Sequence, residues 1–525
     1  MARAADREST GRHAVLVAAG ILLTRLIGLV RTYVFSHYFG LRTGEADAFQ
    51  SAFRIPNFLQ TLFGEGVLSA SFIPVYARLL AEKDEEEAGR VAGAVAALLS
   101  LTVSAIVLVG VVATPYIIDL IAAGFQGGTR ELTIRLVRIL FVGAGLLVMS
   151  AWCLGILNSH RRFFLSYTAP VAWNLVMIAT LLAFGRRVDL TRLAVLLAWG
   201  SVAGSALQFA VQLPAVLRLV RGLRVRWDAA SAHVREVVRN FLPVFVSRGV
   251  VQISAYVDVW LASWLPTGAV TGLSYAQLLY TLPVSLFGMS VSAAELPAMS
   301  SALGNQGEVG EYLRGRLNRG LRRIAFFIVP SAMAFLALGD VIAGALFQSG
   351  LFTHEDAVYV WGILAGSAVG LLASTLGRLY SSTYYALRDT RTPLRYAVIR
   401  VALTTGLGYF CALPLPVWLG IAPRWGVAGL TVSAGVSGWV EFALLRRTLN
   451  ARIGRTGLPA SLAARLWLSA AAGAAIAWAV KLGIGARNPR IAALAILIPY
   501  GLAYFGAAWL LRIEECTQAL RRLRR

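Results

Sequence analysis

The chain carries charged side chains inside segments that are otherwise long and apolar. The clearest case is the segment DAFQSAFRIPNFLQTLFGEGVLSASFIPVY, which contains Asp47, Arg54 and Glu65. In one helix these three positions return to nearly the same face. Charge inside a membrane span is costly and normally faces a bundle interior or a water-filled cavity. This charge stripe therefore predicts either an ion pair that joins two helices or one wall of a polar binding site.

Two arginines lie in the apolar segment that comes before the stripe. The segment HAVLVAAGILLTRLIGLVRTYVFSHYFG holds Arg25 and Arg31. An arginine at the bilayer centre costs about 2.5 to 3.5 kcal/mol on the mildest insertion scale, so two of them indicate a hydrated cavity wall. Arg31, near the end of the segment, could instead reach the membrane interface. The guanidinium fork matches a phosphate, so Arg25, Arg31 and Arg54 predict a site for an anionic diphosphate headgroup.

Further charges lie in apolar segments of the second half. Arg248 and Asp258 are about 80° apart around one helix, so we do not expect them to pair directly. We expect Arg248 and Arg378 to add to the substrate site. Asp258, Asp389 and Thr405 are candidates for an oxygen-lined site that binds a coupling cation or proton. Asp389, in DTRTP, is better explained as the end of a helix and a turn before proline.

Composition indicates a helical membrane protein. Of 525 residues, 58% are hydrophobic and only 14% are charged, whereas a soluble domain has about 25% charged residues. Apolar runs long enough to span a bilayer recur along the chain, and they lack the two-residue alternation of barrel strands. The N-terminal dozen residues are too charged for the apolar region of a cleavable signal, so we expect the first span to be retained.

Charge and cysteine usage exclude several other classes. The net charge of +23 comes almost wholly from arginine, since Lys83 and Lys481 are the two lysines. No separate basic soluble domain carries this charge, so a nucleic-acid partner is not expected. Cys153, Cys411 and Cys516 are scattered, and the five histidines show no ligand spacing. We therefore expect no disulfide framework, metal site or cofactor.

The predicted fold is an all-α polytopic membrane protein with about fourteen transmembrane helices. The inner loops of this arrangement hold 31 arginines and lysines and the outer loops hold 8. Such an asymmetry places both termini in the cytoplasm. The expected spans are 13–38, 47–77, 91–113, 132–157, 163–185, 191–217, 237–263, 268–301, 321–345, 355–387, 394–414, 425–445, 464–482 and 491–511.

The spans divide into two lobes of six helices and a final pair. We expect an N-terminal lobe over 1–219, an amphipathic cytoplasmic linker over 220–236 and a C-terminal lobe over 237–450. Residues 451–525 hold the last two helices, rich in alanine and glycine, which permit close packing. We see no clear sequence repeat between the lobes, so this division depends on counting spans.

The N-terminal landmarks resemble the MurJ/MviN family, the bacterial lipid II flippases. The matching run is TRLIGLVRTYVFSHYFG followed by ADAFQSAFRIPNFLQTLFGEGVLSASFIPVY, and similarity continues in ILNSHRRF and YYALRDTRTP. These residues carry the family pattern Ser/Thr-Arg-x-x-Gly-x-x-Arg, then Asp-Ala-Phe, Phe-Arg/Lys-x-Pro-Asn and Glu-Gly before Phe-x-Pro. The resemblance is firm over the first 80 residues and looser beyond them.

The resemblance implies a fold of the MOP exporter type, with two six-helix lobes around a central cavity. It implies that the two last helices form a groove for a lipid tail. It also implies lipid II as the substrate, moved by alternating access from the inner to the outer leaflet of the bacterial cytoplasmic membrane. Cell-wall synthesis machinery is an expected partner. By position, Arg25 and Arg31 match the family's cavity arginines, and Asp47, Arg54 and Glu65 match its charged second-helix positions.

Departures from the family pattern leave other substrates open. Gln60 and Thr61 stand where the family usually has two arginines, Leu278 stands at a further arginine position, and Thr281 stands at an acidic one. The alternative is a flippase for another polyprenyl-linked saccharide of the O-antigen or capsule type. A cation-coupled drug exporter is disfavoured because arginines repel a cationic drug. No nucleophile–base pair, metal spacing or phosphate loop points to an enzyme.

Overall fold

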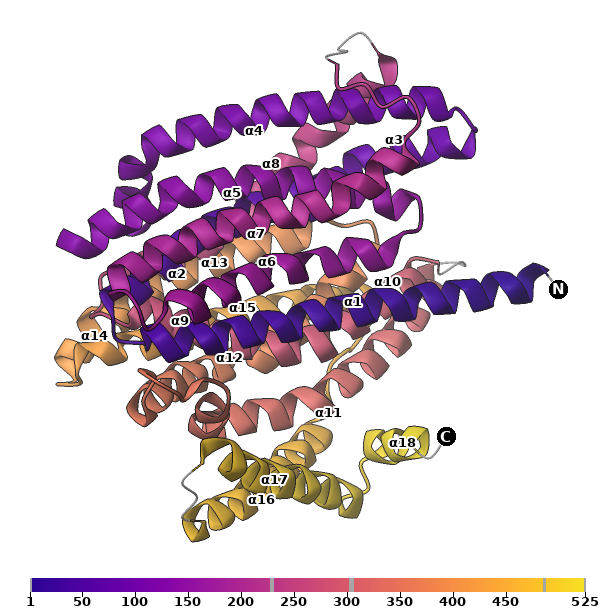
Figure 1. Cartoon of the computed structure of the whole chain (residues 1–525). Coiled ribbons are helices and arrows are strands. Elements are labelled where there is room, and N and C mark those ends of the chain that lie inside the picture. The colour runs from indigo at the N-terminus through magenta and orange to yellow at the C-terminus, as the bar shows by residue number, and fades with distance from the viewer. Residues whose placement is uncertain (1, 227–230, 302–305, 485–487, 524–525) are drawn as a thin grey trace. The chain divides into compact units, whose positions relative to one another are not determined.

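The chain folds into helices that form two compact units. The computed structural model describes residues 2–226, 231–301, 306–484 and 488–523. The units comprise residues 1–260 and 261–525, and Figure 1 shows their helices in colours that follow the chain. The described residues contain no β-strand beyond an isolated bridge between Ser349 and Phe352. The expected all-α fold class is therefore confirmed.

Unit 1 is built around α5. This helix packs against α2, α4 and α7, while α1 packs against α6 and α6 against α7. Small residues let these helices approach closely; at Gly204, for example, a side chain would collide with the backbone of Trp173. The helices are α1 (Ala2–Phe39), α2 (Gly44–Gln60), η1 (Thr61–Leu68), α3 (Ser69–Ala81), α4 (Glu85–Ile121), α5 (Gly127–Ser159), α6 (Phe163–Phe184), α7 (Leu190–Leu219) and α8 (Ala232–Ser263), whose last three residues belong to unit 2.

Unit 2 is built around α12, which packs against α11 on one side and α15 on another. At the α12–α15 crossing Gly370 faces Gly435 so closely that neither position has room for a side chain. The helices are α9 (Ala269–Pro283), η2 (Val284–Met289), α10 (Ser290–Ser300), α11 (Gln306–Phe347), α12 (His354–Ala386), α13 (Arg391–Ala412), α14 (Pro414–Trp418), η3 (Pro423–Trp425), α15 (Gly426–Ile453), α16 (Ala460–Gly483), α17 (Pro489–Leu510) and α18 (Glu514–Leu523).

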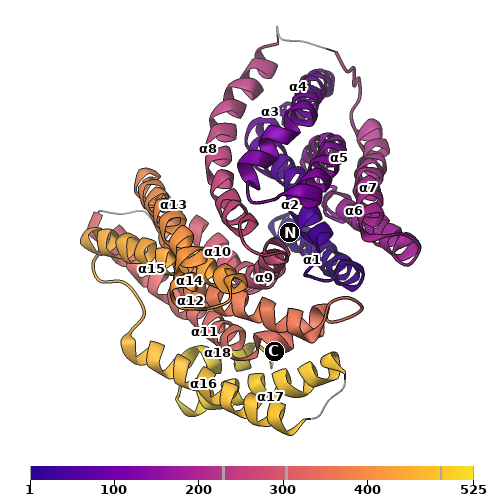
Figure 2. The same cartoon turned by 90° about the vertical axis from the view of Figure 1, so that its left-hand side faces the viewer.

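The last two long helices of unit 2 form a hairpin. Figure 2 shows α16 and α17 side by side, and both pack against α11. A cluster of buried apolar residues lies between the three helices. It contains Leu338 of α11, Ala474 and Ala477 of α16, and Ile496 and Tyr500 of α17. The alanine-rich sequence of α16 therefore serves close helix packing, as expected.

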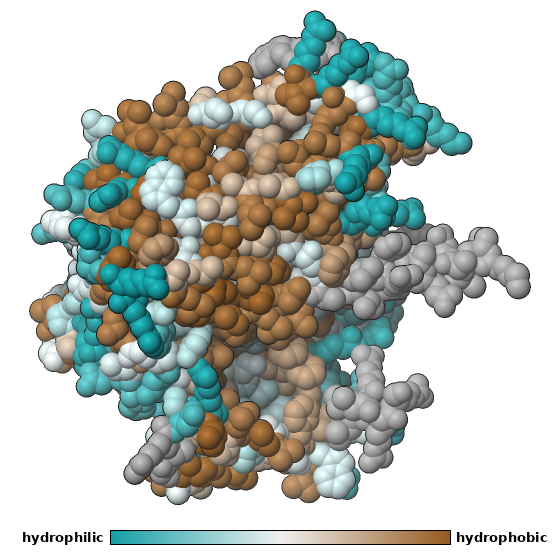
Figure 3. All heavy atoms as spheres, in the orientation of Figure 1, coloured by the Kyte–Doolittle hydropathy of each residue, from teal (hydrophilic) through white to brown (hydrophobic). Residues whose placement is uncertain are grey.

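Eleven helical stretches in the described part of the chain are long and apolar enough to cross a membrane. The face drawn in Figure 3 is largely apolar, and exposed side chains such as Leu108, Val112 and Leu502 contribute to the molecule's apolar surface. The expected spans at 13–38, 47–77 and 237–263 are not among the eleven, and each includes side chains outside the described residues. The total of fourteen spans thus stays a prediction.

Each unit contains an α-helix that changes to a π-helix and back. In unit 1, α2 passes into the π-helix η1 at Thr61 and into α3 at Ser69, where Pro56, Gly64 and Gly66 predict an interruption. In unit 2, η2 follows Pro283 and connects α9 to α10. Both π-helices contain the tripeptide Leu-Phe-Gly, at 62–64 and 286–288. This shared feature is a short repeat that inspection of the sequence missed.

The predicted amphipathic linker at 220–236 is described only in part, since 227–230 lie outside the described residues and 232–236 belong to α8. The structure describes 221–226 without helix, and Gly222 has a φ of +70°, a value that favours glycine. The backbone carbonyls of Arg221 and Arg224 lie against Gly89 and Gly93 of α4, where a side chain would collide with them. This part of the loop is therefore held by backbone packing on α4.

Candidate functional site

Arg31 of α1 lies against aromatic rings of two other helices. Its guanidinium carbon lies 4.8 Å from the ring centre of Phe53 in α2 and 5.8 Å from that of Trp173 in α6. The two rings stack on each other with centres 5.4 Å apart. Contacts with aromatic faces stabilise a guanidinium by about 0.5 to 2 kcal/mol. A guanidinium packed on rings keeps N–H groups at its edge that can donate to an anion.

The aromatic rings around Arg31 are positioned by a hydrogen bond and by a row of phenylalanines. The indole N–H of Trp173 donates to the carbonyl of Ser201 in α7 at 3.1 Å. Phe49 connects Phe53 to Phe35 of α1, with ring centres 5.4 Å apart in both pairs. The site is thus built from α1, α2, α6 and α7 together.

Arg25 lies on a different face of α1 from Arg31. Six residues at 100° each separate the two by about 120° around the helix. The side chain of Arg25 is exposed in unit 1, next to exposed Leu22 and Leu26. One turn of α1 near it is fixed on α6, because the hydroxyl of Thr24 donates to the carbonyl of Tyr167 at 2.7 Å. The structure therefore does not bring the two arginines together on one face.

Asp47 and Arg54 lie on α2 with different degrees of burial. Asp47 is 3% exposed and belongs to the first turn of α2, after the N-cap Thr43. Carboxylates are favoured at this end of a helix by the macrodipole. Arg54, two turns further on, is half-buried. The burial of Asp47 in the first turn therefore suits a carboxylate that stabilises α2.

Arg54 interacts with residues of α8. Its charge interacts with that of Asp258, and the hydroxyl of Tyr256 donates to its backbone carbonyl at 3.4 Å. Phe58, one turn beyond Arg54, packs its ring edge-on against Tyr256, with centres 5.6 Å apart. Asp258, a candidate for a coupling ion, thus belongs to the electrostatic environment of a candidate substrate arginine.

Two other predicted site residues cannot be placed by their side chains. Glu65 lies in the π-helix η1 and Arg248 lies in α8, and both side chains are outside the described residues.

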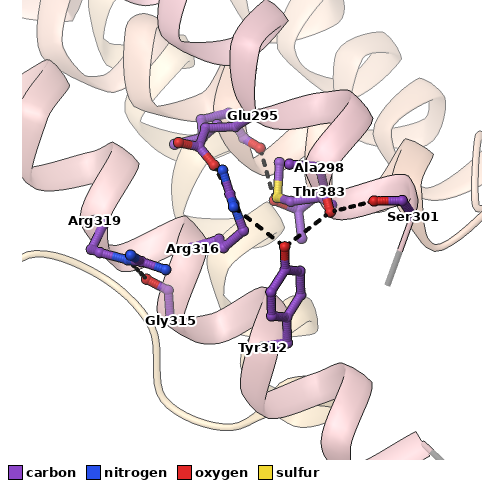
Figure 4. A network of polar contacts seen from close by, with 10 residues as sticks. Glu295, Ala298, Ser301, Tyr312, Gly315, Arg316, Arg319 and Thr383 are labelled. Carbon is purple, nitrogen blue, oxygen red and sulfur yellow. Dashed lines mark hydrogen bonds and ion pairs between the residues drawn. The ribbon is translucent and has the colours of Figure 1, made fainter. Parts of the chain in front are cut away.

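In unit 2 a network of polar contacts joins α10 to α11, as Figure 4 shows. Arg316 of α11 donates to Glu295 of α10 at 2.6 Å and to the hydroxyl of Tyr312 at 3.3 Å. Tyr312 in turn donates to the carbonyl of Ala298 at 3.3 Å. Glu295, a charge inside an expected span, therefore has an arginine partner. Arg378 of α12 is exposed within unit 2.

Asp389 and Thr405 do not come together. Asp389 accepts hydrogen bonds from the backbone N–H groups of Arg391 and Thr392 and a 2.7 Å bond from Arg452. These bonds, with the hydroxyl of Thr392, lower the pKa of the Asp389 carboxyl to about 2. Thr405 lies sixteen residues further along α13, a rise of about 24 Å, and donates to Val401 within its own helix. Asp389 is thus a helix-capping acid, and the two cannot share one cation.

The arginines of unit 1 carry N–H groups that can donate hydrogen bonds to an anion. No group of three or more His, Cys, Asp or Glu residues is positioned to hold a metal ion in the described part of the chain. Sequence reasoning found Arg31 and Arg54 from their charge but missed their aromatic partners Phe53, Trp173 and Tyr256. In the sequence, Phe53 and Phe58 flank Arg54 in AFRIPNF, and this pattern could have indicated aromatic contacts with the arginines.

Comparison with known proteins gives one family and one fold. The model of the family described as "Lipid II flippase MurJ" matches residues 35–487. A relative from Bdellovibrio bacteriovorus, named "Probable lipid II flippase MurJ", is 30% identical over 98% of this chain and 97% of its own. A relative from Burkholderia cenocepacia, named "Lipid II flippase MurJ", is 29% identical over 84% of each chain.

Solved structures share the fold at lower sequence identity. A structure titled "Lipid II flippase MurJ, inward closed conformation" has a TM-score of 0.77 at 24% identity and covers 95% of this chain and 99% of its own. An inward-facing multidrug resistance MATE family transporter of the MOP superfamily has a TM-score of 0.65 at 18% identity, covering 83% of this chain and 98% of its own. The chain therefore shares its fold with these two transporters.

Proposed function

We propose that this chain, which belongs to the MurJ family of lipid II flippases, moves lipid II across the bacterial cytoplasmic membrane. The match to the family over residues 35–487 carries this proposal. Lipid II presents a diphosphate joined to a sugar headgroup and a polyprenyl tail. The direction is from the inner to the outer leaflet, and both termini face the cytoplasm, as the bias of arginines to one set of loops suggests.

Arg31 is the residue that we assign first to the diphosphate. Phe53 and Trp173 hold its guanidinium by their faces, which fixes the plane while N–H groups at the edge donate to phosphate oxygens. Arg25 and Arg54 add positive charge from other positions of unit 1, and Arg248 and Arg378 stay predicted contributors to substrate binding. Asp47, Asp258 and Glu65 offset part of this charge, so that the diphosphate binds and is also released.

Transport would proceed by alternating access of two lobes. We keep the predicted lobes at 1–219 and 237–450, with residues 451–525 as the groove for the lipid tail. The π-helices η1 and η2 supply each lobe with a stretch whose hydrogen-bond register differs from the α-helix on both sides. Such stretches often mark functional sites, and they suit the places where each lobe bends.

Complementation tests the function directly. The gene is expressed in a bacterium whose own lipid II flippase can be depleted, and lipid II accessible at the outer face is measured with a membrane-impermeant reagent. We expect the wild-type chain to restore growth and outer-face lipid II. Depletion that leaves lipid II trapped inside despite stable expression of this chain would contradict the proposal.

A second candidate is a flippase for another polyprenyl-linked saccharide. It is favoured by Gln60 and Thr61 where the family usually has arginines, at the junction of α2 and η1, and by Leu278 in α9. The same complementation separates the two functions. Restored lipid II export removes this second candidate.

A further inference from the structure

A basic pocket lies where α17 ends and α18 begins. Its volume is about 630 Å³. Arg512, Thr517, Gln518 and Arg521 supply two guanidinium groups, a hydroxyl and an amide to its lining. These groups donate hydrogen bonds, and arginine in particular matches phosphate oxygens. The pocket is thus built to accept an anion with several oxygen atoms.

The rim of the pocket is apolar and belongs to a membrane-spanning helix. Trp509 and Leu510, the last residues of α17, also line the pocket and are 60% and 72% exposed. Tryptophan at the end of a span is typical of the headgroup level of a bilayer. An anion that enters this pocket would therefore be attached to hydrocarbon chains lying beside α17.

One acid, Glu514, also lines the pocket, and it forms an ion pair with an arginine of α11. Glu514 lies 3.4 Å from Arg322 of α11, and its neighbour Glu515 lies 3.3 Å from the same guanidinium. This pair of contacts ties α18 to α11. Ile513 and Cys516 are buried, at 1% and 0% exposure. The pocket is therefore a fixed part of unit 2 with excess positive charge.

Arg512 has a backbone conformation that normally belongs to glycine. Its φ is +54°, and the N–H of Ile513 bonds back to the carbonyl of Ala508 at 3.0 Å, which is the Schellman end of a helix. The other non-glycine residues described with positive φ are Lys83, Arg161 and Arg388. All four are basic and lie in the arginine-rich loops. Among these four residues Arg512 is the one whose side chain lines the pocket, so its arginine has a candidate use there that offsets the strain.

We propose that the α17–α18 pocket binds the phosphate of a membrane lipid headgroup. Arg512 and Arg521 pair with the phosphate oxygens, Thr517 and Gln518 donate further hydrogen bonds, and the acyl or prenyl chains lie along Trp509 and Leu510. The chemistry is shared by an anionic glycerophospholipid and by a polyprenyl diphosphate. The site does not depend on which lipid the protein transports.

The test uses the purified full-length chain and two glycine substitutions. Lipid binding is measured by native mass spectrometry in detergent, with phosphatidylglycerol in one arm and a polyprenyl diphosphate in the other. Arg512→Gly removes the guanidinium, and it also removes the strain of a side chain at a left-handed backbone position. Arg161→Gly makes the same change at the end of α5, outside the pocket, and is the matched control.

We expect Arg512→Gly to unfold at the same or a higher temperature than the wild type while binding phosphate-bearing lipid about tenfold more weakly. Arg161→Gly should keep wild-type affinity. The arm in which the loss appears identifies the lipid. Equal affinities of the wild type and Arg512→Gly for both lipids would overturn the proposal, as would equal losses in Arg512→Gly and Arg161→Gly.

Discussion

A single guanidinium shows how this chain carries charge among apolar helices. Arg31 lies on the faces of Phe53 and Trp173, which shield its plane from hydrocarbon and leave N–H groups at its edge for hydrogen bonds. A lysine at this position would offer a point charge without a planar face. The proposed headgroup site therefore predicts a need for arginine specifically and not for positive charge alone.

Arg31→Lys should reduce lipid II export at least about tenfold with little change in thermal stability, because the fork that pairs with phosphate is lost. The measurement is outer-face lipid II in the complementation strain at matched expression. Arg192→Lys is the control, since Arg192 pairs with Asp189 at the exposed start of α7. Full export by Arg31→Lys would show that Arg31 supplies charge alone or has no role in the headgroup site.

Asp389 predicts a pH dependence of stability. Its pKa is lowered to about 2 in the folded chain, against about 3.9 when unfolded. A lowered carboxyl pKa stabilises the fold above the unfolded value, and that stability is lost as the pH falls towards the folded value. The melting-temperature difference between the wild type and Asp389→Asn should hold from pH 7 to about 5 and shrink from about pH 4 to 2. A difference independent of pH would contradict this assignment.

Part of the candidate site could be predicted from residue types alone. Arg25, Arg31, Asp47 and Arg54 stand out in the sequence because charge is rare in apolar runs. Trp173 did not stand out, because aromatic residues are common in membrane helices and the contact with Arg31 joins residues far apart in the chain. The contact between Trp173 and Arg31 becomes visible only when the packing of α6 on α1 is known.

Among the elements, α11 contains a break that the predicted span 321–345 did not include. At Leu338 the backbone leaves the helical range, and the indole N–H groups of Trp361 and Trp478 donate to the carbonyls of Leu336 and Ala337 at 2.9 and 3.0 Å. These bonds join α12 and α16 to the break. Pro330 lies eight residues before the break and Gly339 follows it directly, but apolar run length takes no account of either residue.

A buried ion pair beside this break fixes α16 to α11. Lys481 donates to Asp340 at 2.6 Å, and the carboxylate side chain is 7% exposed. Lys481→Met should destabilise the protein by about 3 kcal/mol, because it leaves a buried charge unpaired. The readout is the free energy of unfolding in detergent.

The double variant Asp340→Leu and Lys481→Met serves as the control, and it should recover most of the loss because no charge remains buried. If both single and double variants unfolded like the wild type, the pair would have no part in holding the α16–α17 hairpin.

At the scale of the whole molecule, hydrophobic run length predicted the helical class and the positions of most long helices. The predicted lobes and the compact units are two different divisions of the chain, and the lobe boundaries stay a prediction. The sequence places the division in the basic loop at 220–236, whereas compact unit 1 extends to residue 260, inside α8. The reason is packing: Phe241 and Phe245 of α8 stack near Phe63 of η1, with ring centres 5.8 and 5.2 Å away. Loop charge reports orientation and carries no information on such contacts.

The central claim is that this chain moves lipid II and grips its diphosphate through Arg31. The most direct measurement is translocation of fluorescent lipid II in vesicles that contain the purified chain, followed by a quencher confined to one side. The account predicts translocation by the wild-type chain, at least about tenfold slower translocation by Arg31→Ala, and wild-type rates for Arg192→Ala. Wild-type and Arg31→Ala vesicles that translocate lipid II equally, or no faster than protein-free vesicles, would contradict it.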